Sequence, residues 1–200
     1  MPSPTPEENN RIKIQDIVDE MLGDDKIVLG LSRFAYCFDE EKQENFIKMF
    51  WQQSTVSGEG RVSHEIESHG NGAVDALFSY LTSHYSPEFK TIKGIKFENF
   101  YVRPFFKKSG SGSNAEVEVV MEFNTKRKKI VTFRHTSKSF VLSAAKVIFS
   151  AVEFYINAEK AFKKLRFLIK DAKNRSRGDL FSEYSYKLSI VVDATSYIGV

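Results

Sequence analysis

The spacing of apolar residues divides the chain into a helical N-terminal part and a strand-rich middle. Ile14, Ile17, Val18 and Met21 recur at helical spacing, which predicts a short amphipathic helix. The apolar residues of 26–38 and 40–51 fit the same spacing, so two further helices are expected there, with Asp39 as the cap between them. Residues 71–81 predict a fourth helix, and residues 54–67 a short strand or hairpin.

From residue 90 onward the apolar spacing changes to two, which is typical of strands. Strands are predicted over 90–102, 117–123, 130–135, 140–156 and 184–192. An amphipathic helix is predicted after residue 157, with Asn157 as its N-terminal cap and Gly178 as its end. This order predicts an α+β fold, in which N-terminal helices pack on a curved, mainly antiparallel sheet and a helix and a strand follow at the C-terminus. No internal repeat is visible.

The domain organisation follows from these elements and from length. We expect a disordered tail at residues 1–9 and a single domain at 10–200, with its core at 26–156 and an extension at 157–200. The N-terminus has no apolar segment of the kind found in secretory signals, and no window of eighteen consecutive apolar residues exists. The lone cysteine, Cys37, excludes an intramolecular disulfide and fits a reducing compartment. A cytoplasmic protein without membrane contact is therefore expected.

Charge and motifs exclude several functional classes. The net charge of +3 is too small for a dedicated nucleic-acid binder. The sequence contains no phosphate-binding loop, no dinucleotide-binding glycine motif, no nucleophile elbow and no Cys-x-x-Cys pair. We expect no cofactor and no metal, because the spacing of the histidines does not bring them together.

Three short segments resemble one known superfamily. They are Tyr36-Cys37-Phe38-Asp39, Phe46–Trp51 and Gly72–Phe78, and over residues 26–125 they resemble the SnoaL-like branch of the NTF2-like, cystatin-like cone superfamily. The resemblance implies a cone-shaped internal pocket for a small apolar or aromatic molecule. Members act as cyclases, dehydratases or isomerases, or serve as binding and dimerisation modules. Dehydratase-type members carry a histidine at the first long strand, and His84 is the nearest one here.

Each candidate site residue has two interpretations. In a pocket, Asp39 would be a general base and Tyr36 a hydrogen-bond donor to a developing enolate, with His84 as a third catalytic residue. Trp51, Phe34 and Phe97 would form the walls that bind the substrate. Equally, Asp39 can cap a helix, and the tyrosine and tryptophan can be ordinary core residues.

Two basic stretches suggest a function of another class. They are Lys126-Arg127-Lys128-Lys129 in a predicted turn and the helix around Lys163, Lys164 and Arg166. They can be solvated surfaces, or they can bind an acidic protein or RNA. The alternative hypothesis is thus a non-catalytic domain that forms a homodimer through its sheet and engages such a partner through the basic helix.

Overall fold

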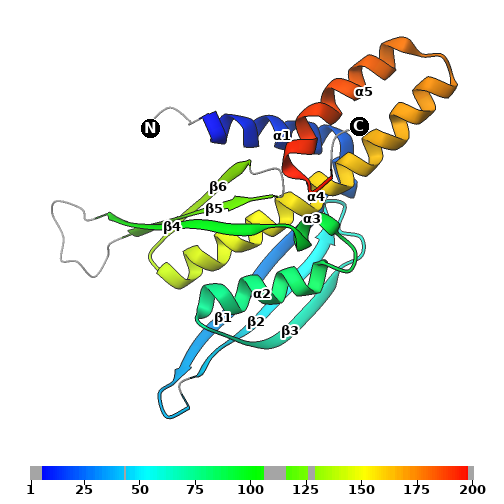
Figure 1. Cartoon of the computed structure of the whole chain (residues 1–200). Helices are drawn as coiled ribbons and strands as arrows, with labels where there is room; N and C mark the ends of the chain where they lie inside the picture. The colour runs from blue at the N-terminus through cyan, green and yellow to red at the C-terminus, as the bar shows by residue number, and fades with distance from the viewer. Residues whose placement is uncertain (1–5, 43, 106–115, 126–128, 198–200) are drawn as a thin grey trace.

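The chain is built from two successive units of the same topology, each with three antiparallel strands followed by a helix (Figure 1). A computed structural model describes residues 6–42, 44–105, 116–125 and 129–197. In both units the strand order in the sheet follows the order in the chain, so the middle strand pairs with both neighbours. The structure therefore contains a repeat of fold that the sequence does not display.

The first unit comprises β1 (Ile27–Asp39), β2 (Glu44–Thr55), β3 (Val62–Gly70) and α2 (Ala73–Tyr85). The second comprises β4 (Lys96–Phe105), β5 (Glu116–Asn124), β6 (Ile130–Ser137) and α4 (Phe140–Asn174). The N-terminal helix α1 (Pro6–Leu22) precedes them, followed by the 3-10 turn η1 (Gly23–Asp25), and α3 (Lys90–Lys93) joins the two units. The chain continues with α5 (Gly178–Val191) and the 3-10 turn η3 (Val192–Ala194).

Helix α4 is the centre of the molecule. It packs on β5 and β6 of its own unit, on β1 and α2 of the first unit, and on α1 and α5 (Figure 1). Over residues 143–162 nearly every side chain is buried, which is the pattern of a helix enclosed on all sides. By length and composition, α4 alone among the described helices could cross a membrane, but 67% of its most apolar window is buried inside the structure. Such burial is typical of a core helix.

The two helices predicted over residues 26–51 are wrong, because this segment is the long β1–β2 hairpin. The spacing of two is clear in β2, where Ile47, Met49 and Trp51 are buried and the intervening Lys48 and Phe50 are exposed. A run rich in apolar residues fits both periods, and pairing with the neighbouring strands decided between them. The proposed packing of two helices on a sheet of residues 90–156 is therefore also wrong.

Two predicted strands are helices instead. Residues 140–156 are rich in β-branched and aromatic side chains, yet they form the first half of α4, where Ser139 caps the helix by accepting the Leu142 N–H at 3.3 Å. Burial on every side explains this composition. Residues 184–192 lie in α5 and η3, so the C-terminal strand does not exist. Asn157 is not a cap, because it lies in the middle of α4.

Some of the remaining predictions fit the structure and others do not. The α+β class is confirmed, as are the helices around residues 14–21 and 73–81 and the strands over 117–123 and 130–135. The strand predicted over 90–102 is only partly correct, because Lys90–Lys93 form the helix α3 and β4 begins at Lys96. Residues 6–9 of the expected tail lie in α1, and residues 1–5 are outside the described residues. The expected boundary at residue 157 falls within α4.

Candidate functional site

The predicted catalytic residues lie at different places in the first unit. Asp39 ends β1, and its Oδ1 accepts the Lys42 N–H at 3.1 Å, so it stabilises a turn between strands and caps no helix. Tyr36 is exposed on β1 and its hydroxyl donates to Asn45 Oδ1. His84 lies in the last turn of α2. Neither Asp39 nor His84 is among the residues that line the cavity beside Tyr36, so this cavity does not bring the three side chains together.

Trp51 and His84 belong to one aromatic cluster between β2, β3 and α2. Trp51 on β2 is fully buried, stacks on His64 with ring centroids 4.1 Å apart, and meets His84 edge-on at 5.4 Å. Burial lowers the pKa of both histidines, and in His84 the nearby His64 lowers it further. Phe34 is half-buried on β1 and packs against the core. Trp51 therefore fills the interior, whereas His84 is an exposed residue of α2 and Phe34 lies at the margin of the core.

Tyr36 and Phe97 come together at the junction of the two units. They line a cavity of about 420 Å³ whose other walls are the start of α2, from Asn71 to Phe78, and the start of α4, at Phe140 and Val141. Both residues were predicted to line a pocket, and they share this surface although 61 positions separate them. The cavity is mainly apolar and its walls come from both units.

Strand β4 extends this apolar surface, because none of the helices in the described residues packs extensively on it. All ten of its residues are exposed. Phe97, Phe100 and Val102 stand opposite buried residues of β5, so their side chains lie on the same face of the sheet as the core. We call the combined surface the β4 patch, and it consists of Tyr36, Phe97, Phe100, Val102 and Phe140.

The β4 patch is continuous. The ring centroid of Phe100 lies 6.4 Å from that of Phe97 and 5.8 Å from that of Phe140. Tyr36 lines the junction cavity together with Phe97 and Phe140. Each of the five side chains is between 36% and 42% exposed. Exposed aromatic residues grouped in this way mark interaction surfaces, whereas single exposed apolar residues are common on any protein.

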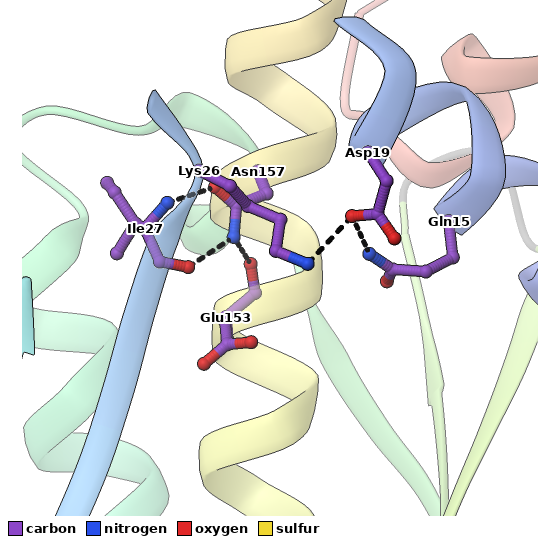
Figure 2. Close-up of polar contacts among 6 residues, drawn as sticks. All are labelled: Gln15, Asp19, Lys26, Ile27, Glu153 and Asn157. Carbon is purple, nitrogen blue, oxygen red and sulfur yellow. Dashed lines mark hydrogen bonds and ion pairs between the residues drawn. The ribbon is translucent and has the colours of Figure 1, made fainter. Parts of the chain in front are cut away.

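The equivalent strand of the first unit, β1, is covered at its start by α4. The Asn157 side chain accepts the Ile27 N–H and donates to the Ile27 carbonyl (Figure 2). Both hydrogen bonds are 2.8 Å long. One turn earlier, Glu153 Oε2 accepts the Leu29 N–H at 2.7 Å. We call these four residues the β1 clasp. The Asn157 amide pairs with the strand edge as a neighbouring strand would, so this edge is closed.

The clasp holds a partly buried carboxyl group. Burial raises the pKa of Glu153, although the Leu29 N–H and the positive charge of Lys26 partly oppose the shift. Lys26 itself pairs with Asp19 of α1 at 2.7 Å, and Gln15 donates to the same carboxylate (Figure 2). The start of β1 is thus tied to both α4 and α1.

The basic residues predicted to bind a partner have different surroundings. Lys163 pairs at 2.8 Å with Glu159, a buried carboxylate that also accepts the Thr91 N–H and the Tyr197 hydroxyl. Burial alone would raise the pKa of Glu159, but these hydrogen bonds outweigh it and lower the pKa. Lys164 and Arg166 are exposed. Residues 126–128 of the other basic stretch lie outside the described residues.

The part of the chain that the structure describes contains no group of three or more His, Cys, Asp or Glu side chains placed to hold a metal ion. Sequence analysis missed Phe100, Val102 and Phe140 as surface residues. The available signal was that β4 carries large apolar residues on both faces, since Tyr101 and Phe105 alternate with Phe100 and Val102. A strand covered on one face only would alternate with polar residues.

Comparison with known proteins corrects the family assignment. No curated protein matches the chain. The sequence model of one family, described as the LeuA allosteric (dimerisation) domain, matches residues 11–156. This match overturns the SnoaL-like and NTF2-like assignment, and with it the internal pocket with cyclase, dehydratase or isomerase activity. It spans α1 and both three-stranded units and ends within α4. The chain therefore belongs to the LeuA allosteric (dimerisation) domain family.

Proposed function

We propose that this chain is a non-catalytic domain that forms a homodimer through the β4 patch. The observation that carries the proposal is the exposed apolar face of β4. The other five strands pack against a helix: β1, β5 and β6 against α4, and β2 and β3 against α2. The family description names dimerisation, and a second copy of the chain is the occupant that this description supports. Symmetric pairing would bring the same patch of two copies together.

The composition of the patch fits such an interface. Three phenylalanines and a tyrosine supply large contact areas with few rotatable bonds, and residues of this kind dominate binding energy in protein interfaces. The patch also takes side chains from both units, with Tyr36 from the first and the rest from the second. A partner seated there would fix the orientation of one unit relative to the other, which gives dimerisation a route to the allosteric role that the family description names.

Two neighbouring substitutions on β4 test the proposal. Phe100 and Tyr101 are both exposed, but they point to opposite faces of the sheet. A lysine at Phe100 would put a charge in the centre of the proposed interface, and we expect the dissociation constant of the dimer to rise by roughly 30-fold or more, the scale of an interface hot spot. Tyr101→Lys is the matched control and should leave the dimer intact.

Sedimentation equilibrium of the parent chain and both variants measures the effect. Thermal melts of the two variants should agree, because both positions are on the surface. A parent chain that stays monomeric at high concentration, or a dimer that is lost in Tyr101→Lys but kept in Phe100→Lys, would rule out the β4 patch as the interface.

A further inference from the structure

The C-terminal end of α4 and α5 form an antiparallel helical hairpin that projects from the body of the molecule (Figure 1). This hairpin lies beyond residue 156, so the family match does not include it. The turn between the helices is well defined, with Ser176 at a φ of 55° and the Arg177 N–H bonded to the Ala172 carbonyl at 2.9 Å. The hairpin is therefore an ordered addition to the domain of this chain.

A groove of about 820 Å³ runs between the two helices of the hairpin. Each helix contributes one stripe with the spacing i, i+4, i+7, i+8 and i+11, so the groove follows both helix axes. The stripe of α4 consists of Phe162, Arg166, Ile169, Lys170 and Lys173, and the other stripe of Phe181, Ser185, Leu188 and Ser189 of α5 and Val192 at the start of η3. The floor is apolar, and every charged residue in the lining is basic and comes from α4.

Several basic residues of the hairpin that lie outside the groove are held in ion pairs, although Lys164 forms none with any described residue. The basic residues outside the lining that lie within 3.2 Å of a carboxylate oxygen are Lys163, Arg175, Arg177 and Lys187. By contrast, Arg166, Lys170 and Lys173 form no ion pair with any described residue. Arg166 lies over the Phe162 ring, with its guanidinium carbon 5.9 Å from the ring centroid. The groove thus combines an apolar floor with three cations on one side that the described chain leaves unpaired.

We propose that this groove binds an acidic amphipathic helix of a partner protein. Two antiparallel helices with a groove between them accept a third helix, which would bury its apolar stripe against Ile169, Phe181 and Leu188. The eleven-residue interval from Phe162 to Lys173 spans about 16 Å, which corresponds to roughly three turns of helix.

The distribution of charge selects the class of partner. Cations line only the α4 side, while Ser185 and Ser189 on the α5 side are small and neutral. An amphipathic helix with acidic residues along one flank of its apolar stripe matches this asymmetry. A nucleic-acid backbone would leave the apolar floor unused, because its outer surface is charged throughout.

A designed peptide tests the proposal with the full chain. The probe is a fluorescein-labelled peptide of about fourteen residues, with leucines at helical spacing and glutamates along one flank, and its binding is followed by fluorescence anisotropy. We expect saturable binding, and no binding of the same peptide with lysines in place of the glutamates. Lys170→Glu should weaken binding about tenfold or more, since it replaces a favourable charge by an unfavourable one.

Two further variants separate the groove from general charge effects. Lys164 is exposed, lies outside the groove lining and forms no ion pair with the described residues, so Lys164→Glu is the matched control and should keep the parent affinity. Phe181→Ser should weaken binding through the floor alone. The proposal is overturned if the acidic peptide does not bind, if both lysine variants weaken it equally, or if single-stranded RNA or anionic lipid vesicles bind the groove with the same dependence on Lys170.

Discussion

Strands β1 and β4 occupy equivalent places in the two units, yet the start of β1 is covered whereas β4 is exposed over its whole length. Each is the first strand of its unit and the outer strand of its sheet. The start of β1 is covered by α4, so that Ile27 and Leu29 are buried and bonded to its side chains. All of β4 is exposed. The difference shows that one repeat alone does not determine which surface is free, because a helix from the second unit completes the first.

The comparison also explains why α4 is much longer than α2. Helix α2 has 13 residues and covers only its own sheet, whereas α4 has 35. The first turns of α4 cover β5 and β6, its middle closes β1, and its end builds the hairpin. Among the described residues, no helix covers β4 in the way that α4 covers the start of β1. In a dimer, the partner molecule would cover β4 instead.

The largest expected effect comes from breaking the β1 clasp. In Asn157→Leu the Ile27 N–H and carbonyl would be buried without partners, and each such group costs about 1–3 kcal/mol, so we expect the free energy of unfolding to fall by about 3 kcal/mol. Urea denaturation measures this loss, and hydrogen exchange at Ile27 and Leu29 should accelerate. Gln52→Ala, on an exposed position of β2, is the control. A variant as stable as the parent would show that the clasp does not hold the two units together.

A smaller effect, which depends on pH, is expected from Glu153, the second residue that α4 contributes to the clasp. The pKa of Glu153 is raised in the folded state, chiefly by burial, so its contribution to stability is present below the pKa of the unfolded chain and is lost as the pH rises through the folded pKa. Glu153→Gln cannot ionise and can still accept the Leu29 N–H. The stability of this variant relative to the parent should therefore increase from pH 4 to pH 7.

Chemical denaturation at a series of pH values checks this sign. Glu65→Gln, at an exposed position on β3, serves as the control and should follow the parent curve. A relative stability of Glu153→Gln that decreases with rising pH would mean that the Glu153 carboxylate is favoured, not disfavoured, in the fold.

The smallest effect is expected at the ion pair next to the clasp, between Lys26 and Asp19. The Lys26–Asp19 pair has its carboxylate half exposed, and exposed ion pairs contribute about 0.5 kcal/mol or less. Lys26→Ala should therefore lower the free energy of unfolding by about that amount, and the difference should vanish in 1 M salt. A loss as large as that of Asn157→Leu would instead place the stability of β1 in its contact with α1.

A segment could be predicted correctly when the spacing of its apolar residues fitted either a strand or a helix, but not both. In β5 the alternation of Val117, Val119, Met121 and Phe123 with glutamates leaves no second interpretation, and the strand was predicted. In β1 the apolar residues fit a helix equally well. In α4 the sequence around Val147 to Ile156 has the composition of a strand, because a helix buried on all sides has no polar face to show its period.

The candidate site was predictable only in part, for a related reason. Tyr36 was predicted as a hydrogen-bond donor and Phe97 as a wall residue of a pocket, and both line one cavity, but their meeting depends on how the two units pack. Asn157 had the signature of a helix cap, and its contact with Ile27 could not be foreseen from local spacing. The exposure of β4 likewise depends on the absence of a covering helix, which is a property of the whole fold.

The clasp also has a consequence for the order in which the chain is made. Ile27 and Asn157 are 130 residues apart, so the ribosome must complete the whole second sheet before the first one can be closed. At about 5–20 residues per second this interval lasts roughly ten seconds, during which β1 has an open edge that can pair with other nascent chains. The first strands to be synthesised are thus the last to be protected, and any delay in translation before residue 157 prolongs their exposure.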